Sequence, residues 1–217
     1  MTYLDEASLR QVRMAVLAKA PVAGLAKTRL IPALGAAGAA RLQRRLTRQT
    51  LATVQAAGLG PLTLWCAPDE QHRFFRALRR RCGVACRGQP AGDLGQRMLA
   101  AFCDAAAPGP LLLVGTDCPP LRPAHLRAAA AALLQGNDAV FIPAEDGGYV
   151  LVGLRQPQPA LFEQMTWSTD QVMAQTRRRA QALGLQWREL APLWDLDLPA
   201  DLDRWRRAGG GAADRLP

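Results

Sequence analysis

The chain has 217 residues, of which 49% are hydrophobic and 21% charged, and a formal net charge of +9 at pH 7. This length suits one domain with a sizeable core, and the apolar runs are too short for a membrane-spanning helix. Residues 1–13 lack the apolar stretch of a secretion signal, so we expect a cytoplasmic protein without a membrane span.

Arginine supplies all but two of the 27 cationic side chains. The arginines gather in runs at 41–48, 76–81, 177–179 and 204–207, each with the spacing of an amphipathic helix. Such runs are typical of solvated helix faces, and they lack a glycine-rich arm or a recognisable nucleic-acid-reading module. We therefore expect no nucleic-acid partner, while a small phosphate-bearing ligand stays compatible with the basic surface.

Short apolar runs alternate along the chain with longer amphipathic stretches. The pattern predicts strands at 13–18, 61–67, 83–88, 110–115, 138–144, 149–154 and 186–190. It predicts helices at 36–58, 69–81, 91–107, 122–136, 169–183 and 199–207, with Asp69 as the N-cap of the second. Gly147 and Gly148 indicate a sharp reversal before the sixth strand, which should run in a different direction.

This alternation predicts an α/β fold, a three-layer sandwich with a mostly parallel central sheet. We expect a single domain over residues 1–207 and a flexible, glycine-rich tail over 208–217. Ligands of such folds bind at the carboxyl ends of the strands. Four predicted strands are followed there by polar motifs, so the functional residues should lie at that edge of the sheet.

The stretch LAKAPVAGLAKTRL, residues 17–30, holds both lysines of the chain, Lys19 and Lys27. Gly24 permits close approach of the backbone to a ligand, and Lys27 and Arg29 place two cations at the mouth of the loop. A compact lysine ammonium can follow a phosphate as it moves, so the loop suits phosphate, although an ordinary surface loop is the alternative. We expect Lys27 to be an exposed cation whose replacement weakens nucleotide binding and spares the fold.

Acidic residues follow two other predicted strands. Asp117 leaves the strand PLLLVG, and Asp195 and Asp197 in WDLDLP are spaced so that both carboxylates face one side of an extended segment. Oxygen ligands from separate strand ends suit Mg²⁺ or Mn²⁺ bound jointly with a diphosphate. The alternatives are that Asp117 caps a turn and that Asp197 caps the helix beginning near residue 199.

Six motifs occur in an order that resembles a known family: APVAGLAKTRL, GDLGQRM, GTDCPPL, PAEDGGYVLVGL, TWSTDQV and WDLDLPADL. From about residue 14 to residue 205 the chain resembles the bacterial glycosyltransferase-like family associated with arsenosugar biosynthesis, formerly a domain of unknown function. That family is similar to the nucleotide-diphospho-sugar transferase superfamily, which has the GT-A fold. The resemblance implies a Rossmann-like GT-A domain, a nucleoside-diphosphate sugar donor, a small-molecule acceptor and Mg²⁺ or Mn²⁺.

The resemblance also implies roles for individual residues. The nucleotide-binding set is Ala18, Pro21, Gly24, Lys27, Arg29, Gly92, Asp93, Leu94 and Gly95. The metal ligands are Asp117, Asp195 and Asp197, and the sugar or acceptor would meet Gly147, Gly148 and Tyr149. Apart from the resemblance, Trp167 precedes a predicted helix in the polar segment TWSTD, where it is either a stacking surface for a sugar or base or a packing residue. The residues themselves suggest the base: Asp146 or Glu145 would take the proton of the acceptor hydroxyl, because His72 and His125 lie in predicted helices away from the motif loops.

Three functional classes stay open: sugar transfer, nucleotidyl transfer of the guanylyltransferase kind to a phosphorylated metabolite, and binding of nucleotides or of nucleic acid without catalysis. The nucleotidyltransferases of the superfamily usually carry a doubled glycine in the first loop, where this chain has the single Gly24. Sugar transfer is therefore favoured. The sequence names neither the base, the sugar nor the acceptor, and it leaves the oligomeric state open.

Overall fold

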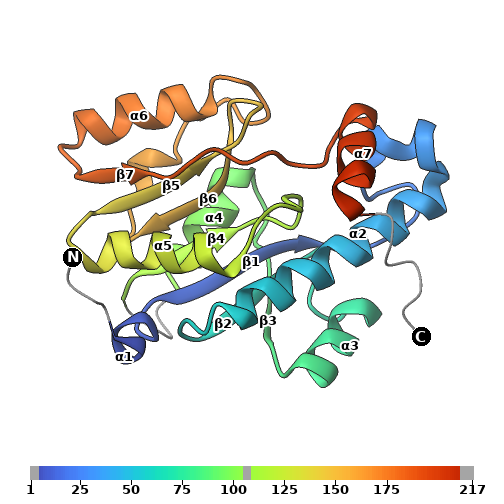
Figure 1. The fold of residues 1–217 in the computed structure, drawn as a ribbon, viewed down its shortest axis with the longest axis horizontal. Helices are drawn as coiled ribbons and strands as arrows, with labels where there is room; N and C mark the ends of the chain where they lie inside the picture. Colours follow the sequence, from blue (N-terminus) through green and yellow to red (C-terminus); the bar gives the residue numbers. More distant parts are fainter. Residues whose placement is uncertain (1–4, 105–108, 211–217) are drawn as a thin grey trace.

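A computed structural model describes residues 5–104 and 109–210 (Figure 1). Seven strands form one sheet. They are β1 (Arg13–Lys19), β2 (Leu62–Ala67), β3 (Ala85–Gly88), β4 (Leu111–Val114), β5 (Ala139–Pro143), β6 (Tyr149–Leu154) and β7 (Trp187–Glu189). Each predicted strand is present, because short apolar runs between turn residues can form the interior of a parallel sheet.

The strands lie in the order β3-β2-β1-β4-β6-β5-β7. Neighbours run parallel except β6, which is antiparallel to both β4 and β5, as the glycine pair before it predicts. From β1 the chain builds outward through β2 and β3, then crosses to β4 on the other side of β1. The strand order therefore reverses between β1 and β4, the place where ligands bind in open α/β sheets.

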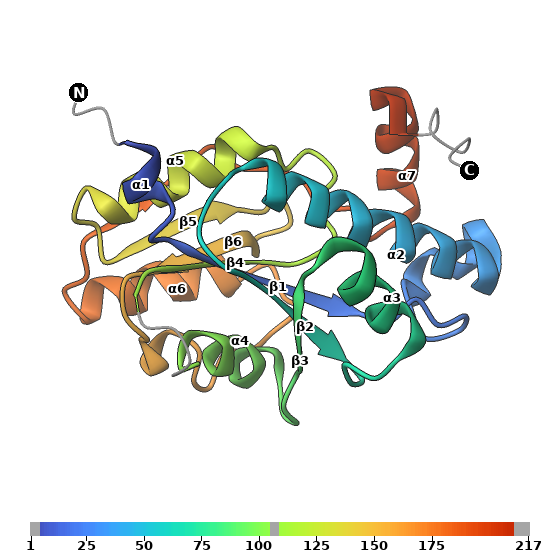
Figure 2. The same cartoon turned by 90° about the horizontal axis from the view of Figure 1, so that it is seen from below.

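Helices cover both faces of the sheet and make the predicted three-layer sandwich (Figure 2). They are α1 (Glu6–Leu9), α2 (Ile31–Ala56), α3 (Arg73–Cys82), α4 (Leu94–Phe102), α5 (Pro123–Leu134), α6 (Val172–Ala182) and α7 (Pro199–Trp205). Short turns η1 (Thr28–Leu30), η2 (Pro159–Leu161) and η3 (Arg206–Gly210) complete the elements. Helices α2, α3 and α5 pack on one face, and α4 and α6 on the other.

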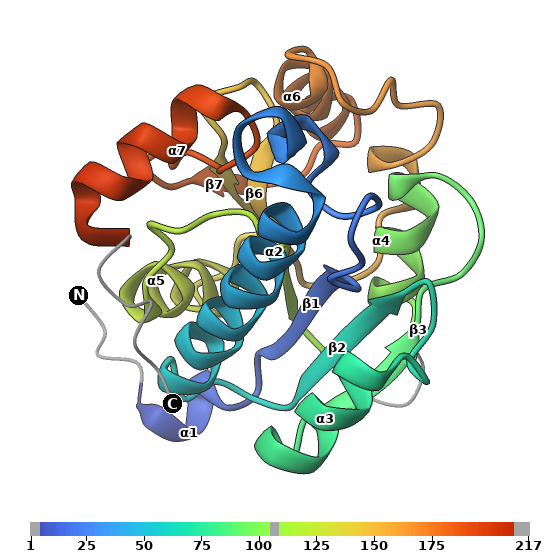
Figure 3. The same cartoon turned by 90° about the vertical axis from the view of Figure 1, so that its right-hand side faces the viewer.

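Alternate side chains of each strand supply the two cores. In β1, Met14 and Val16 pack under α2, α3 and α5, whereas Ala15 packs toward α4 and α6. Helix α7 lies outside these layers and packs against α2 through Leu202 (Figure 3). The guanidinium of Arg45 on α2 also lies 4.6 Å from the ring centre of Trp205. The segment before α7 is thereby held beside the start of α2.

Several predicted boundaries are wrong. The helix expected at 69–81 begins at Arg73, because Asp69 Oδ1 accepts from the Gln71 N–H in a separate turn while His72 Nδ1 caps the helix through the Phe74 N–H. Helix α2 begins five residues early and bends at Gly35, whose φ of 67° is non-helical. Short α1 was not expected at all.

The predicted helix 91–107 begins at Leu94 and ends at Phe102, and residues 105–108 lie outside the described ranges. At the C-terminus, 208–210 continue as helical turn η3, and the remainder of the predicted tail lies outside the described residues. In residues 5–104 and 109–210, no helix combines the length and apolar character needed to cross a membrane.

Candidate functional site

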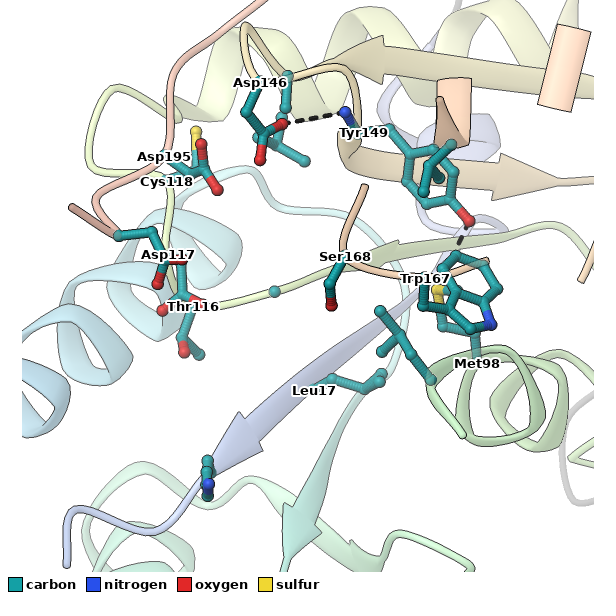
Figure 4. A pocket seen from close by; sticks show the side chains of 18 of the residues that line it. Leu17, Met98, Thr116, Asp117, Cys118, Asp146, Tyr149, Trp167, Ser168 and Asp195 are labelled. Carbon is teal, nitrogen blue, oxygen red and sulfur yellow. Dashed lines mark hydrogen bonds between the residues drawn. The ribbon is translucent and has the colours of Figure 1, made fainter. Parts of the chain in front are cut away.

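A cavity of about 640 Å³ opens at the carboxyl ends of β1 and β4, where the strand order reverses. The start of antiparallel β6 reaches the same edge, so the loops before it join those after β1 and β4. Figure 4 shows Asp117, Asp146 and Asp195 on one side of the cavity, and Met98, Tyr149 and Trp167 on the other. The predicted motifs therefore meet in one place.

Lys27 does not have the exposure that the sequence analysis expects. Its side chain is only 3% exposed, and its Nζ lies 2.8 Å from Asp117 Oδ1 and 3.8 Å from Asp197 Oδ1. The ammonium also donates a short hydrogen bond to the carbonyl oxygen of Leu196. Lys27 is thus a buried tie between the loop after β1, the loop after β4 and the segment before α7.

The acidic segment 195–197 is held extended beside the end of β4. The Leu196 N–H donates to the carbonyl oxygen of Asp117 at 2.7 Å, and the Leu196 side chain is fully buried. Asp195 and Asp197 consequently both face the cavity, as their spacing predicts. Asp197 does not cap α7, because Asp201 Oδ2 accepts from the N–H groups of Asp197 and Leu198 instead.

The carboxylates of Asp117, Asp146, Asp195 and Asp197 form an acidic wall of the cavity, and they influence one another's charge. Burial first, and then the nearby charge of Asp146, raise the pKa of Asp195 to about 6, with further contributions from Asp117 and Asp197. Arg29 neutralises part of this negative charge, since its guanidinium lies 2.6 Å from Asp197 Oδ2. The wall nevertheless concentrates more carboxylates than it has cations in contact with them, which favours binding of a further cation.

These residues fit a divalent ion that is shared with a ligand. Asp117 Oδ1 is buried and accepts no hydrogen bond from the part of the chain that the structure describes, because Lys27 approaches it outside hydrogen-bond geometry. Within the described residues, no three His, Cys, Asp or Glu side chains converge closely enough to hold a metal by themselves. Mg²⁺ is commonly bound through one or two carboxylates plus substrate phosphates, and the arrangement suits that mode.

Of the two candidate bases, only Asp146 lines the cavity. Its Oδ1 accepts from the Gly148 N–H at 3.0 Å. Glu145 points elsewhere and makes two hydrogen bonds to Arg204, of 2.6 and 2.9 Å, which lower the pKa of its carboxyl. The structure therefore places Glu145 outside the cavity and leaves Asp146 at its edge.

The turn that carries Asp146 is shaped by Gly147, which has a φ of 91°. A Cβ at this position would lie 2.1 Å from the carbonyl oxygen of Asp170, so only glycine fits the close approach. Gly147 itself does not line the cavity, whereas Gly148, Tyr149 and Trp167 do. The rings of Tyr149 and Trp167 meet edge to face at 6.5 Å.

In the GDLG motif, Leu94 alone lines the cavity. Asp93 is the N-cap of α4: its Oδ1 accepts from the Gln96 N–H, and Gln96 Oε1 accepts from the Asp93 N–H. Gly95 lets Trp167 approach the helix, since a Cβ there would lie 2.8 Å from the indole. Gly92 likewise leaves room for Gln96. The GDLG motif therefore mainly shapes the side of the cavity formed by α4.

In the loop after β1, too, only some of the predicted nucleotide-binding residues line the cavity. Ala18, Lys27 and Arg29 line the cavity, whereas Pro21 is buried and Gly24 lies exposed outside it with a φ of 83°. Gly24 thus serves the turn of the loop.

Sequence reasoning missed Gln89 and Lys19 as site residues. Gln89 Nε2 donates to the carbonyl oxygens of Trp65 and Ala18, at 2.8 and 3.2 Å, which fixes the amide at the cavity with its oxygen as the acceptor left over. Lys19 lines the cavity and is exposed, unlike Lys27. Only the position of Lys19 at a strand end offered a signal, and Gln89 lay in a segment without an evident motif.

The fold and the cavity define an α/β protein with a candidate ligand site at the switch point of its sheet. A family profile matches residues 50–169, and the chain belongs to that family, described as uncharacterized proteins conserved in bacteria (DUF2064). The match includes the motifs around Asp93, Asp117 and Asp146 and excludes the first loop and the segment 195–197. No curated protein is significantly similar to this sequence.

Solved structures share the fold. A protein from Desulfovibrio desulfuricans G20, proposed to be a nucleotide-diphospho-sugar transferase, has 25% identity and a TM-score of 0.84 over 94% of this chain and 89% of its own. The manganese complex of Rv0371C from Mycobacterium tuberculosis H37Rv has 19% identity and a TM-score of 0.54, covering 93% and 99%. The inositol-1-phosphate CTP transferase from T. maritima has 11% identity and a TM-score of 0.59, covering 97% and 99%. The nucleotide-diphospho-sugar transferase-like fold is therefore confirmed.

Proposed function

We propose that this protein transfers a sugar from a nucleoside-diphosphate donor to a small-molecule acceptor, using Mg²⁺ or Mn²⁺. The observation that carries the proposal is the meeting of Asp117, Asp195 and the lysine-containing loop in one cavity at the ends of β1 and β4. The similarity to the Desulfovibrio protein supports it. The sequence resemblance extends the proposal to arsenosugar biosynthesis.

In this proposal the nucleobase lies near Leu25 and Leu94, two cavity residues whose side chains are 60% and 44% exposed. Exposed leucines at a cavity mouth can cover the faces of a base, and the Gln89 oxygen can accept from a base N–H. The diphosphate extends from there toward Lys19, Arg29 and the acidic wall. Asp117 and Asp195 would hold the ion, which supplies positive charge to the leaving diphosphate.

The protein's own groups account for the other half of the reaction. The acceptor hydroxyl attacks the anomeric carbon, its proton passes to the Asp146 carboxylate, and the bond from that carbon to the diphosphate oxygen breaks. Tyr149 and Trp167 give the sugar or acceptor a largely apolar wall. Lys27 and Arg29 hold Asp117 and Asp197 in place for the charged end of the donor.

The test is a panel of nucleoside diphosphates and triphosphates, each added with Mn²⁺ while the melting temperature is recorded. Ligands that bind the folded state raise that temperature by mass action, and we expect a diphosphate to raise it most. A preference for a triphosphate, with release of pyrophosphate, would instead indicate nucleotidyl transfer. A melting temperature that no nucleotide changes would contradict both activities and the non-catalytic alternative.

Lys19→Ala is expected to weaken nucleoside-diphosphate binding by about fivefold and to leave the melting temperature unchanged. The reason is that an exposed cation contributes on the order of 1 kcal/mol to a contact with a phosphate and little to the core. Calorimetric titration measures the affinity. Arg178→Ala, which removes an exposed cation of α6 outside the cavity, is the control, and equal affinities for both variants would remove Lys19 from the site.

A further inference from the structure

Arg97 on α4 lines the cavity but has no role in the proposed donor site. Its Nε is buried and has no hydrogen-bond partner, and in the described ranges no carboxylate forms an ion pair with its guanidinium. The other cations of the cavity differ: Lys27 and Arg29 contact carboxylates, and Lys19 extends into solvent. Arg97 is thus a partly buried cation to which the described residues bring no counter-charge.

Structural arginines elsewhere in this fold have acceptors. Arg179 donates to the carbonyl oxygens of Ala160, Glu163 and Gln164, and Arg177 makes two hydrogen bonds to the Glu189 carboxylate. A buried donor without an acceptor costs about 1–3 kcal/mol, more when the group is charged. Arg97 has no such partner in residues 5–104 and 109–210: its Nε is buried, and its terminal Nη groups are the donors left for a ligand in the cavity.

The wall around Arg97 has the character that strengthens such a contact. Helix α4 lends the cavity Leu94, Arg97 and Met98, and none of these is acidic. Tyr149 packs on the helix with its hydroxyl 3.8 Å from Met98 Sδ, and Trp167 packs on Gly95, which has no Cβ to hold the indole away. This side of the cavity offers the Arg97 guanidinium and apolar surface, so an anionic ligand group complements it.

We propose that Arg97 binds an anionic group of the substrate, a carboxylate or a phosphate, that is distinct from the metal-bound diphosphate. The diphosphate belongs beside the acidic wall, with the cations of the loop after β1, whereas Arg97 comes from the helix after β3. A guanidinium binds either anion through two parallel hydrogen bonds. The inference rests on the proposed function, and it makes the acceptor or the transferred sugar an acid.

The test follows the side-chain Nε–H signals of ¹⁵N-arginine-labelled protein by NMR while inorganic phosphate or acetate is added. The Arg97 signal is assigned by its loss in Arg97→Gln. We expect it to shift downfield and saturate with at least one anion, and the anion that does so separates a phosphorylated from a carboxylated substrate. In samples that also carry ¹⁵N-tryptophan, the affinity is followed at the Trp167 indole signal, and we expect it to fall about tenfold or more in Arg97→Gln and to stay unchanged in Arg178→Gln.

Each titration is run without nucleotide and with Mn²⁺ and a nucleoside diphosphate. An Arg97 signal that neither anion shifts, or equal anion affinity in wild type and Arg97→Gln, overturns the inference. A large loss of diphosphate affinity in Arg97→Gln also overturns it, because Arg97 would then serve the donor. If wild type binds no nucleotide the proposed function fails, and the nucleotide-free titration still decides whether Arg97 binds an anion.

Discussion

Asp117→Asn is expected to lower metal-dependent binding of a nucleoside diphosphate by about 100-fold or more, and to change metal-free binding little. The side chain keeps its shape but loses the charge that a hard cation needs, and even indirect partners of metal ligands are worth 10–100-fold in metal affinity. About half of the Asp117 side chain is exposed to the cavity, whereas its Oδ1 is buried against Lys27. Calorimetric titration of nucleotide with and without Mn²⁺ measures the effect.

The matched control is Asp203→Asn, which removes an exposed carboxylate of α7 that pairs with Arg206 outside the cavity. Asp195→Asn should change binding in the same direction as Asp117→Asn, by a factor that shrinks as the pH falls toward 6, since the Asp195 carboxyl, with its pKa raised to about 6, is increasingly protonated there in wild type. An Asp117→Asn protein that binds Mn²⁺ with nucleotide as tightly as wild type would remove Asp117 from the metal site.

Lys27→Ala is expected to lower the free energy of unfolding by about 2 kcal/mol and the melting temperature by about 4–8 °C. Removing one partner of a fully buried ion pair costs about 3–5 kcal/mol, and the smaller value applies here because Asp117 and Asp197 are 47% and 38% exposed. The carbonyl oxygen of Leu196 also loses its donor. Thermal and denaturant unfolding measure the change.

Lys19→Ala is the control, because that side chain is exposed and should leave stability unchanged. Lys27→Met retains most of the aliphatic stem and separates the lost charge from the lost packing. If Lys27→Ala unfolds at the wild-type temperature, the contacts of Lys27 with Asp117, Asp197 and Leu196 do not stabilise the fold. The sequence-based prediction of an exposed, phosphate-binding Lys27 would then hold instead.

The sequence was sufficient for the seven strands and for the edge of the sheet where polar motifs gather. These depend on local signals: apolar runs of strand length, glycines at turns and the two-residue spacing of Asp195 and Asp197. Such signals do not depend on which distant segments later pack together. The direction of β6 was predictable for the same reason, because Gly147 and Gly148 mark a reversal within the chain.

Features that depend on contacts between residues far apart in the sequence could not be predicted. Lys27 is separated by 169 residues from the carbonyl that fixes it, and nothing near it in the sequence indicates burial. Glu145 and Asp146 are neighbours of equal charge, and only the position of Arg204 on α7 draws Glu145 away from the cavity. The resemblance made Asp93 a ligand residue, whereas its carboxylate accepts from the Gln96 N–H as the local cap of α4. Gln89 is identified as a site residue by the hydrogen bonds that fix its amide at the cavity, and Arg97 by its lack of partners among the described residues.

In the proposed function, the cavity binds a divalent ion and a nucleoside diphosphate together. Electron paramagnetic resonance of Mn²⁺ at room temperature measures it directly, because bound Mn²⁺ loses the sharp signal of the free ion. Mn²⁺ is titrated into the protein, into a nucleoside diphosphate, and into both, with UDP, GDP, CDP, ADP and dTDP in turn. We predict that with one of these nucleotides the mixture binds Mn²⁺ more tightly than protein and nucleotide do separately. Binding that equals the sum of the separate components for all five nucleotides would contradict the shared site.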